Sequence, residues 1–243
     1  MNIVLLGYGK TGRDIETVAG ERGHIVADRF TSSRPFTESH SSLLRAQSVD
    51  CCIDFSTPDA AVGHILLCIR HGIPIVVGTT GWHSRLGEIT ALVNRHHGAL
   101  VHASNFSLGA YLFLKIVESA ALLFDGAPEY DAAVHETHHR FKKDAPSGTA
   151  RTIAGILLQH LQRKEVLQTH PAASGIAPHE LHVSSTRLGS VFGTHTVAFS
   201  SSADEIELTH RANNRRGFAL GAVMAAEWVQ GKQGVFTADD VFA

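Results

Sequence analysis

The sequence has 243 residues, enough for one large domain or two small ones with a core that needs no disulfide staples. Hydrophobic residues make up 44% and charged residues 18%, which excludes a disordered chain, and a net charge of −2 gives no reason to expect nucleic acid or an anionic membrane as a partner. The three cysteines form no CxxC pair, and no stretch of about 18 apolar residues is present to span a membrane. Since the chain opens directly on a predicted strand, without a signal peptide, we expect a soluble cytoplasmic protein.

The first half of the sequence alternates short apolar runs with helical patterns. Strands that alternate with helices predict a mostly parallel sheet covered on both faces, as in a Rossmann-type α/β domain. The predicted strands cover residues 2–6, 24–27, 49–55, 73–77 and 100–103, and the predicted helices cover about 11–22, 58–72 and 88–96.

The second half differs, because several β-like runs follow one another without intervening helices. This order predicts a second α/β domain with an antiparallel or mixed sheet. We expect the last helix to pack back on the first sheet, which gives a discontinuous dinucleotide-binding domain (1–106 and 211–243) around a second domain (107–210). The predicted strands here cover 129–137, 181–187, 195–200 and 205–209, and the predicted helices cover 108–124, 147–162 and 217–229.

A glycine loop with the GxGxxG pattern lies between the first predicted strand and the first predicted helix. Gly7 permits a tight turn, Gly9 lets the backbone approach a pyrophosphate, and Gly12 permits close packing of helix on strand. The helix N-terminus would direct free N–H groups at the phosphates. The loop therefore predicts NADH or NADPH as cofactor, and a glycine turn without a ligand is the alternative. The predicted contacts are Gly7, Tyr8, Gly9, Lys10, Thr11 and Gly12.

Two charged residues stand at the end of the second predicted strand. Asp28 lies where an acidic side chain usually hydrogen-bonds the adenosine ribose and favours NAD. Arg29 follows it and would instead suit the 2′-phosphate of NADP, or lie as a solvated charge. The pair leaves the choice between NADH and NADPH open.

Further predicted cofactor contacts stand at the carboxyl ends of later strands. Phe55 and Ser56 stand at the end of the third predicted strand, and Gly78, Thr79 and Thr80 follow the fourth. In an open parallel sheet ligands bind at this edge, so we expect these loops to flank the nicotinamide ribose. Capping of the loop is the alternative role for Thr79 and Thr80.

Residues 136–150 concentrate titratable groups in the run E-T-H-H-R-F-K-K-D-A-P-S-G-T-A. The end of this run predicts a helix N-terminus whose N–H groups, at Ser147, Gly148 and Thr149, suit a substrate carboxylate. We expect cationic side chains beside it, at 138, 139 and 142, to complement an acidic substrate and to deliver a proton. Metal binding is the other use of a His pair, but adjacent His residues point in different directions and no third ligand has zinc spacing. We therefore predict no metal.

The same run resembles, at every fixed position, the signature E-x-H-H-x-x-K-x-D-A-P-S-G-T-A of the 4-hydroxy-tetrahydrodipicolinate reductase (dihydrodipicolinate reductase) family. The resemblance covers nearly the whole chain, including 78–81, 104–107, 187–189, 193–195 and 210–212. It implies NAD(P)H-dependent reduction of (2S,4S)-4-hydroxy-2,3,4,5-tetrahydrodipicolinate to tetrahydrodipicolinate with loss of water, in lysine and diaminopimelate biosynthesis. It also implies a second domain that binds the substrate and whose sheet builds a homotetramer.

The resemblance further implies roles for individual residues. His138 matches the catalytic histidine, Lys142 the proton donor and His139 a substrate contact. Gly148 and Thr149 match a loop that grips a substrate carboxylate. How His138 and Lys142 divide the proton transfer stays open. The other implied cofactor contacts are Ser104, Asn105, Phe106 and Ser107.

Two other interpretations are weighed against this one. A dehydrogenase of another substrate class, such as a small acid like aspartate, or a sugar, would share the two-domain plan but lack the run at 138–149. An NAD(P)-binding sensor or regulator without catalysis would keep the glycine loop but need no titratable cluster. Such a regulator usually carries a nucleic-acid-binding module, which the sequence does not show.

Overall fold

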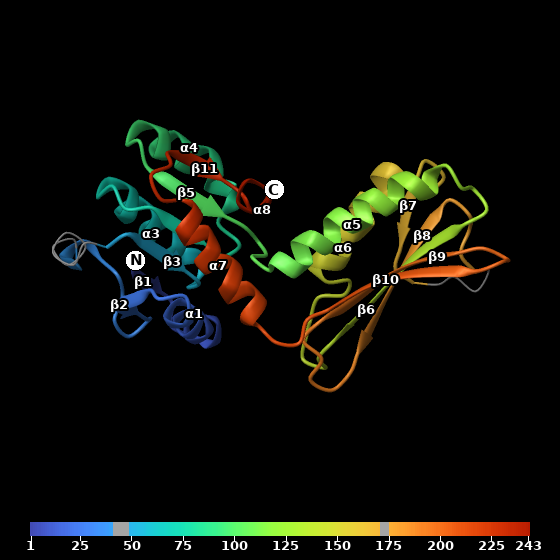
Figure 1. The fold of residues 1–243 in the computed structure, drawn as a ribbon, viewed down its shortest axis with the longest axis horizontal. Coiled ribbons are helices and arrows are strands. Elements are labelled where there is room, and N and C mark those ends of the chain that lie inside the picture. Colours follow the sequence, from blue (N-terminus) through green and yellow to red (C-terminus); the bar gives the residue numbers. More distant parts are fainter. Residues whose placement is uncertain (41–48, 171–174) are drawn as a thin grey trace. The chain divides into compact units, whose positions relative to one another are not determined.

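Two units make up the chain in the computed structural model, which describes residues 1–40, 49–170 and 175–243 (Figure 1). Unit 1 comprises residues 1–108 and 215–243, and unit 2 comprises residues 109–214. Within the described ranges, no helix is both long and apolar enough to cross a membrane.

Unit 1 is built on a parallel sheet with the strand order β11-β5-β4-β3-β1-β2. The predicted Rossmann-type sheet is therefore confirmed, and its central strands β3 and β4 are buried along their whole length. Strand β11 escaped prediction because three residues with a glycine carry little β signal. The strands are β1 (Asn2–Leu6), β2 (Ile25–Phe30), β3 (Cys51–Asp54), β4 (Ile75–Val77), β5 (Ala99–His102) and β11 (Gly234–Phe236).

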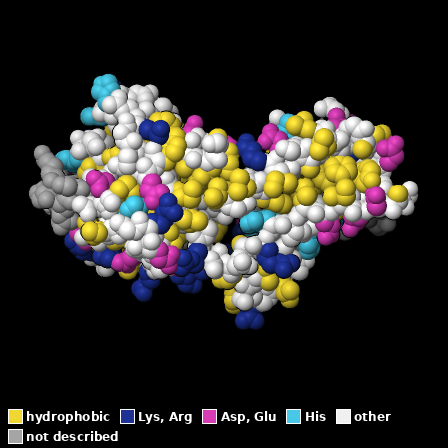
Figure 2. Space-filling view, in the orientation of Figure 1, with side chains coloured by type: hydrophobic (Ala, Val, Ile, Leu, Met, Phe, Trp, Pro, Cys, Tyr) yellow, Lys and Arg dark blue, Asp and Glu magenta, His cyan; other side chains and the backbone are white. Residues whose placement is uncertain are grey.

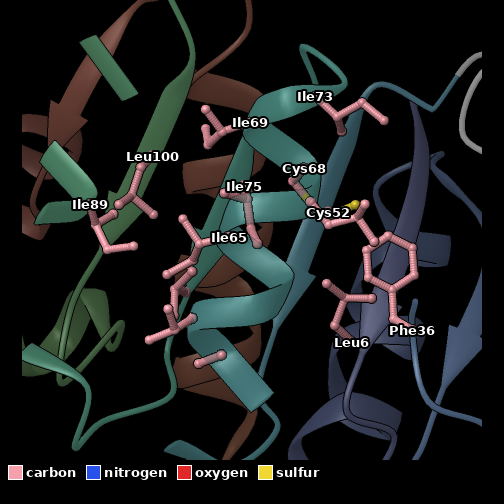
Figure 3. Packing of buried hydrophobic residues seen from close by; sticks show 14 of the residues in the cluster. Leu6, Phe36, Cys52, Ile65, Cys68, Ile69, Ile73, Ile75, Ile89 and Leu100 are labelled. Carbon is pink, nitrogen blue, oxygen red and sulfur yellow. The ribbon is translucent and has the colours of Figure 1, made fainter. Parts of the chain in front are cut away.

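Helices cover both faces of this sheet, because side chains of successive strand residues point to opposite faces. On one face α3 and α4 pack on residues such as Leu6, Cys52 and Leu100, and Figure 3 shows Ile65 and Ile69 of α3 in this layer. On the other face α1 and α7 pack on residues from the same strands that point the opposite way. The helices are α1 (Lys10–Glu21), α3 (Pro58–Arg70), α4 (Leu86–Arg95), α7 (Arg216–Trp228) and α8 (Ala238–Phe242), with 3₁₀ turns at Glu38–His40 and His83–Arg85.

The segments by which the chain leaves and re-enters unit 1 pack against each other. A Cβ atom added to Gly221 of α7 would lie 1.7 Å from the carbonyl oxygen of Phe106, and one added to Gly217 would lie 3.0 Å from Ser107 Oγ. Glycine at position 221 is therefore required for α7 to sit on the segment that follows β5.

Unit 2 contains the mixed sheet that the sequence predicts, with the order β10-β9-β6-β8-β7. Strand β6 runs parallel to β8 and antiparallel to β9. Helices α5 (Leu108–Asp125) and α6 (Gly148–His160) supply the apolar residues that pack on one face of the sheet. Strand β7 escaped prediction because it has only three residues. The strands are β6 (Asp131–His138), β7 (Val166–Gln168), β8 (Glu180–Arg187), β9 (Thr194–Ser200) and β10 (Glu205–Arg211).

Helix α5 also carries exposed apolar side chains. Leu112, Ile116, Leu122 and Leu123 are between 48% and 78% exposed, and Figure 2 shows hydrophobic side chains along this helix. An exposed apolar stripe of this kind is a common feature of surfaces that contact another protein.

Candidate active site

The glycine loop has the geometry that an anion site at a helix N-terminus requires. Gly7 has a φ of +95°, and a Cβ atom there would lie 2.3 Å from the carbonyl oxygen of Phe55. A Cβ atom at Gly12 would lie 2.3 Å from the carbonyl oxygen of Gly7, so this glycine lets α1 start tightly against the loop. Gly9 is the N-cap of α1, no side chain caps it, and the space at its Cα is open. The first N–H groups of α1 are thus available to a phosphate.

The charged residues on β2 already have protein partners. The Asp28 carboxylate pairs with both terminal nitrogens of Arg34, at 2.6 and 2.8 Å, and this hydrogen bonding lowers the pKa of Asp28. The Arg29 guanidinium pairs with Glu16, which also accepts the hydroxyl of Tyr8. Asp28 lies inside β2 and not at its end, because the strand continues to residue 30. No local sequence pattern indicates that Arg34 and Glu16 pair with these two side chains.

A cavity of about 260 Å³ opens at the carboxyl ends of β3 and β4. Four predicted cofactor contacts from these two loops and Thr11 from α1 share its wall, so the structure brings together residues far apart in sequence. Ser56, in the loop that the sequence predicts to flank the nicotinamide ribose, lines the cavity too, whereas Pro58 was not predicted as a contact. The lining residues are Thr11, Phe55, Ser56, Pro58, Gly78, Thr79 and Thr80.

The predicted contacts 104–107 follow β5, which neighbours β4. Asn105 folds its side-chain oxygen back to accept the N–H of Ser107 at 2.8 Å. Phe106 is 1% exposed and packs in the core of unit 1, with its ring centroid 6.2 Å from that of Phe55. The Phe106 side chain therefore supports Phe55 from behind and is closed to a ligand.

In unit 2, strand register assembles a second group of polar residues. The buried face of β6 continues from Ala132 and Val134 to Glu136 and His138. Glu136 stands opposite Ser185 of β8 on one side and opposite His195 of β9 on the other, and His138 stands opposite Arg187. Because side chains alternate along a strand, these polar groups share the face that α6 covers.

Glu136 is the centre of this cluster and is fully buried. Its Oε1 atom accepts hydrogen bonds from Ser185 Oγ at 2.8 Å, the backbone N–H of Ser147 at 3.1 Å and the guanidinium of Arg187 at 3.1 Å. Burial raises the pKa of the Glu136 carboxyl, but the donors at Ser147, Ser185 and Arg187 outweigh it and leave the pKa below its ordinary value. The cluster therefore holds a buried carboxylate.

Both histidines of the cluster favour the neutral form. Nδ1 of His138 lies 3.2 Å from Glu136 Oε2, close enough for an ion pair, although the two atoms are not aligned for a hydrogen bond. Burial lowers the pKa of His138, and Lys142 and Arg187 lower it further against the opposing effect of Glu136. Burial and His138 lower the pKa of His195 to about 4. This differs from the expectation of a cationic His138, because the sequence pattern did not show how deeply the ring is buried.

Lys142 lies in the loop after β6 and is only partly exposed. Its Nζ atom pairs with Asp144 Oδ1 at 2.9 Å, which lowers the pKa of Asp144. Arg187 holds the loop by donating to the carbonyl oxygens of Asp144, at 2.6 Å, and of Lys142, at 3.3 Å. The Nδ1 atom of His139 is buried without a hydrogen-bond partner in the described part of the chain.

The N-terminus of α6 lies beside the Glu136 cluster. Ser147 caps the helix by accepting the N–H of Ala150 at 3.2 Å, and its hydroxyl also lies 3.2 Å from Nε2 of His195. Ser147 is 2% exposed, so its hydroxyl and N–H groups bond to other protein groups and are not accessible to a ligand. Gly148 is exposed and Thr149 is half-buried, which leaves their N–H groups as the accessible ones at this end.

Ligand atoms of Glu136, His138 and His195 lie within 4.8 Å of one another, so these three residues have the chemistry to hold a metal ion. The Arg187 guanidinium already forms an ion pair with the Glu136 carboxylate, and its positive charge disfavours a metal cation at the same place. The absence of a metal stays a prediction.

The sequence analysis assigned no role to the side chains of Glu136, Ser185, Arg187 and His195. A usable signal was present in residues 131–138, where alternation with period two places Glu136 and His138 on the same face as Ala132 and Val134. The other three come from strands distant in sequence, and only strand register brings them to Glu136.

Comparisons with known proteins identify the family. Residues 1–106 match the family model described as dihydrodipicolinate reductase, N-terminus, and residues 109–242 match its C-terminus counterpart. A 4-hydroxy-tetrahydrodipicolinate reductase from Christiangramia forsetii is 39% identical over 243 residues, covering 100% of this chain and 98% of that protein. One from Aquifex aeolicus is 38% identical, covering 94% of this chain and 89% of the relative.

A solved structure shares the fold. Dipicolinate-bound dihydrodipicolinate reductase from Paenisporosarcina sp. TG-14 superposes with a TM-score of 0.77 at 24% identity, covering 98% of this chain and 97% of the other. Together with the family models and the full-length relatives, this likeness confirms the family that the sequence resembles. The chain belongs to the dihydrodipicolinate reductase family of NAD(P)H-dependent oxidoreductases.

Proposed function

We propose that this chain reduces 4-hydroxy-tetrahydrodipicolinate to tetrahydrodipicolinate with loss of water, holding NADH or NADPH on unit 1 and the dicarboxylate on unit 2. The observation that carries the proposal is the accessible N-terminus of α6 beside Lys142 and the neutral His138. This site offers N–H donors for a carboxylate, together with a lysine ammonium group that can supply a proton.

On unit 1, the uncapped N-terminus of α1 and residues 7–12 suit the pyrophosphate. Asp28 lies on β2, on one side of β1, and suits the hydroxyls of the adenosine ribose. The cavity at β3 and β4 lies on the other side of β1, where the nicotinamide half would extend. When bound, the reduced dinucleotide supplies the hydride.

On unit 2, the N–H groups of Gly148 and Thr149 bind one substrate carboxylate, as they stand at the positive end of α6. The half-buried ring of His139 gives a further polar contact. Ser147 acts by position, because it caps α6 and donates its N–H to Glu136.

Lys142 is the proton donor in this proposal, and His138 orients the substrate as a neutral ring. The 4-hydroxyl group of the substrate leaves as water together with a ring proton, which creates the conjugated imine. Hydride addition then builds negative charge on this system, and the Nζ ammonium of Lys142 neutralises it by proton transfer. His138 is a poorer donor near neutral pH, because burial lowers its pKa and leaves few protonated rings. Glu136 fixes His138 from the buried side.

We further propose a homotetramer built through unit 2 and a cytoplasmic location. One face of the mixed sheet packs on α5 and α6, and the opposite face presents half-buried and exposed residues, such as Thr196 and Thr209. The three cysteines are free and buried, which suits a reducing compartment. Light scattering on the purified protein would report the molar mass, and a monomer would contradict the tetramer.

The test is oxidation of NADH and of NADPH with substrate generated in situ from pyruvate and aspartate semialdehyde by the upstream synthase. We expect rapid oxidation in the wild type and a loss of kcat of roughly 10²- to 10⁴-fold in Lys142→Ala, the usual effect of removing a positioned acid. Lys143→Ala, a change at the exposed neighbour, is the matched control and should keep the wild-type kcat. Unchanged turnover in Lys142→Ala would remove this lysine from the chemistry.

A further inference from the structure

A buried network lies directly behind the cavity of unit 1, and the mechanism above does not use it. Asp54 is the last residue of β3 and is fully buried. Its Oδ2 atom lies 2.5 Å from Nδ1 of His64 in α3. Its Oδ1 atom accepts the hydroxyl of Ser56 at 2.7 Å, the N–H of Ser56 at 2.9 Å and the hydroxyl of Thr79 at 2.7 Å.

The hydrogen atoms of this network can be assigned from its chemistry. A carboxylate only accepts hydrogen bonds, so both hydroxyl groups and the imidazole Nδ1 direct their hydrogens at Asp54. Thr79 Oγ1 additionally accepts the N–H of Ser56 at 2.9 Å. Each hydroxyl oxygen then has lone pairs left but no hydrogen to offer. Ser56 and Thr79 are among the residues that line the cavity, so any contact that their hydroxyl oxygens make with a ligand there is as hydrogen-bond acceptors.

The cavity is on the side of the sheet where the nicotinamide half of a dinucleotide would lie. The strand order places β3 and β4 on the opposite side of β1 from β2, which carries Asp28. That half of the cofactor carries two kinds of donor, the carboxamide N–H and the ribose O–H. A phosphate offers only acceptors and would meet the lone pairs of Ser56 and Thr79, with a buried carboxylate behind them.

We propose that Asp54, held by His64, is a positioning residue that turns the hydroxyls of Ser56 and Thr79 into obligatory acceptors for a donor group on the nicotinamide half of NAD(P)H. The network thereby sets the direction in which the dinucleotide lies across the sheet. This inference rests on the proposed placement of the cofactor on unit 1.

Binding to the wild type tests the pairing directly and distinguishes its two possible donors. Fluorescence titration would compare NADH with reduced 3-acetylpyridine adenine dinucleotide, which lacks the amide N–H, and with an NADH analogue deoxygenated at the nicotinamide ribose. We expect one analogue to bind about 10-fold more weakly than NADH, because it leaves an acceptor unpaired. Equal affinity for all three would overturn the proposal.

Two variants test the role of the buried pair. Asp54→Asn replaces an acceptor with a group that also donates, and His64→Phe keeps a ring beside Phe36 but removes the donor to Asp54. In Asp54→Asn we expect the KM for NADH to rise about 10-fold, with kcat and the KM for the dicarboxylate within about 2-fold of wild type. His64→Phe should also raise the KM for NADH, but by less than Asp54→Asn does. Asp59→Asn, at an exposed position of α3, is the control and should match the wild type.

The variants should also lose the discrimination between NADH and the weaker analogue. A merely structural role would lower affinity for both dinucleotides equally, and that result would overturn the proposal. If Asp54→Asn fails to fold, the fluorescence titration of NADH and its analogues on the wild type still tests the proposal. Failure of the proposed function looks different, because the wild type itself would then neither bind nor oxidise the reduced dinucleotide.

Discussion

The two units place their polar groups in different ways. In unit 1 the groups that suit a ligand stand in loops at the carboxyl ends of parallel strands, and the carboxylate behind them, Asp54, is satisfied by neutral donors and one imidazole. In unit 2 the carboxylate and both histidines stand on the strands themselves, on the face that packs against α6. A ligand site in loops can change without disturbing the sheet, whereas the cluster of unit 2 is part of the core.

This difference predicts how function and stability are coupled in each unit. Loops tolerate substitution because few buried contacts depend on them. A charge on the buried face of a strand, in contrast, is stable only while its partners remain. Substitutions in the buried cluster of unit 2 should therefore affect folding and catalysis together, and substitutions at exposed positions of the proposed cofactor site should affect binding alone.

The largest effect is expected for Glu136→Gln. The change removes the charge that faces Arg187 and His138 while keeping the shape of the side chain. We expect the free energy of unfolding to fall by about 3 kcal/mol, because a buried pair loses one partner, and kcat to fall with it. Urea denaturation and steady-state kinetics would measure the two effects. Glu205→Gln, at an exposed position of β10, is the control, and equal stability of the two variants would contradict a buried ionic core.

A pH-dependent effect follows from His195. Its pKa is about 4 in the folded protein and about 6.5 in an unfolded chain, so the unfolded state binds more protons between these values. The free energy of unfolding should therefore be undiminished above pH 6.5 and fall by about 1.4 kcal/mol per unit as the pH drops toward 4. His138, whose pKa is also lowered, adds to the loss.

Urea denaturation at a series of pH values would measure this slope. The slope should be shallower in His195→Gln, whereas His96→Gln, at an exposed histidine, should keep the wild-type slope. An identical slope in His195→Gln would show that this ring does not titrate as its burial implies.

The smallest effect is expected at the cofactor site. In Asp28→Ser the Arg34 guanidinium loses its carboxylate partner and becomes available to a 2′-phosphate. We expect the ratio of kcat/KM for NADPH to that for NADH to rise about 10-fold, with stability unchanged within about 0.5 kcal/mol. In the double variant Asp28→Ser with Arg34→Ala, the NADPH-to-NADH ratio of kcat/KM should return to the wild-type value. A ratio that stays high would show that a cation other than Arg34 binds the 2′-phosphate.

Much of the fold could be predicted because its signals are local. The strand at 2–6, the glycine loop and the alternation of strands and helices before residue 103 all follow from runs of neighbouring residues. The short strands β7 and β11 carry too few residues for such a signal. The substrate site was predicted only where it is continuous in sequence, at 138–149. The contributions of Ser185, Arg187 and His195 depend on strand register, which a single sequence does not specify.

The contact of Gly221 and Gly217 with residues 106 and 107 has a consequence for engineering. The segments by which the chain leaves and re-enters unit 1 meet within that unit. Unit 2 therefore has the topology of a domain inserted at one point of unit 1. Joining Leu108 to Arg215 through a short Gly-Ser linker would remove unit 2 and leave unit 1 as one continuous domain. The same junction is a suitable place to replace unit 2 with another inserted domain, and so to give one dinucleotide-binding domain a new substrate range.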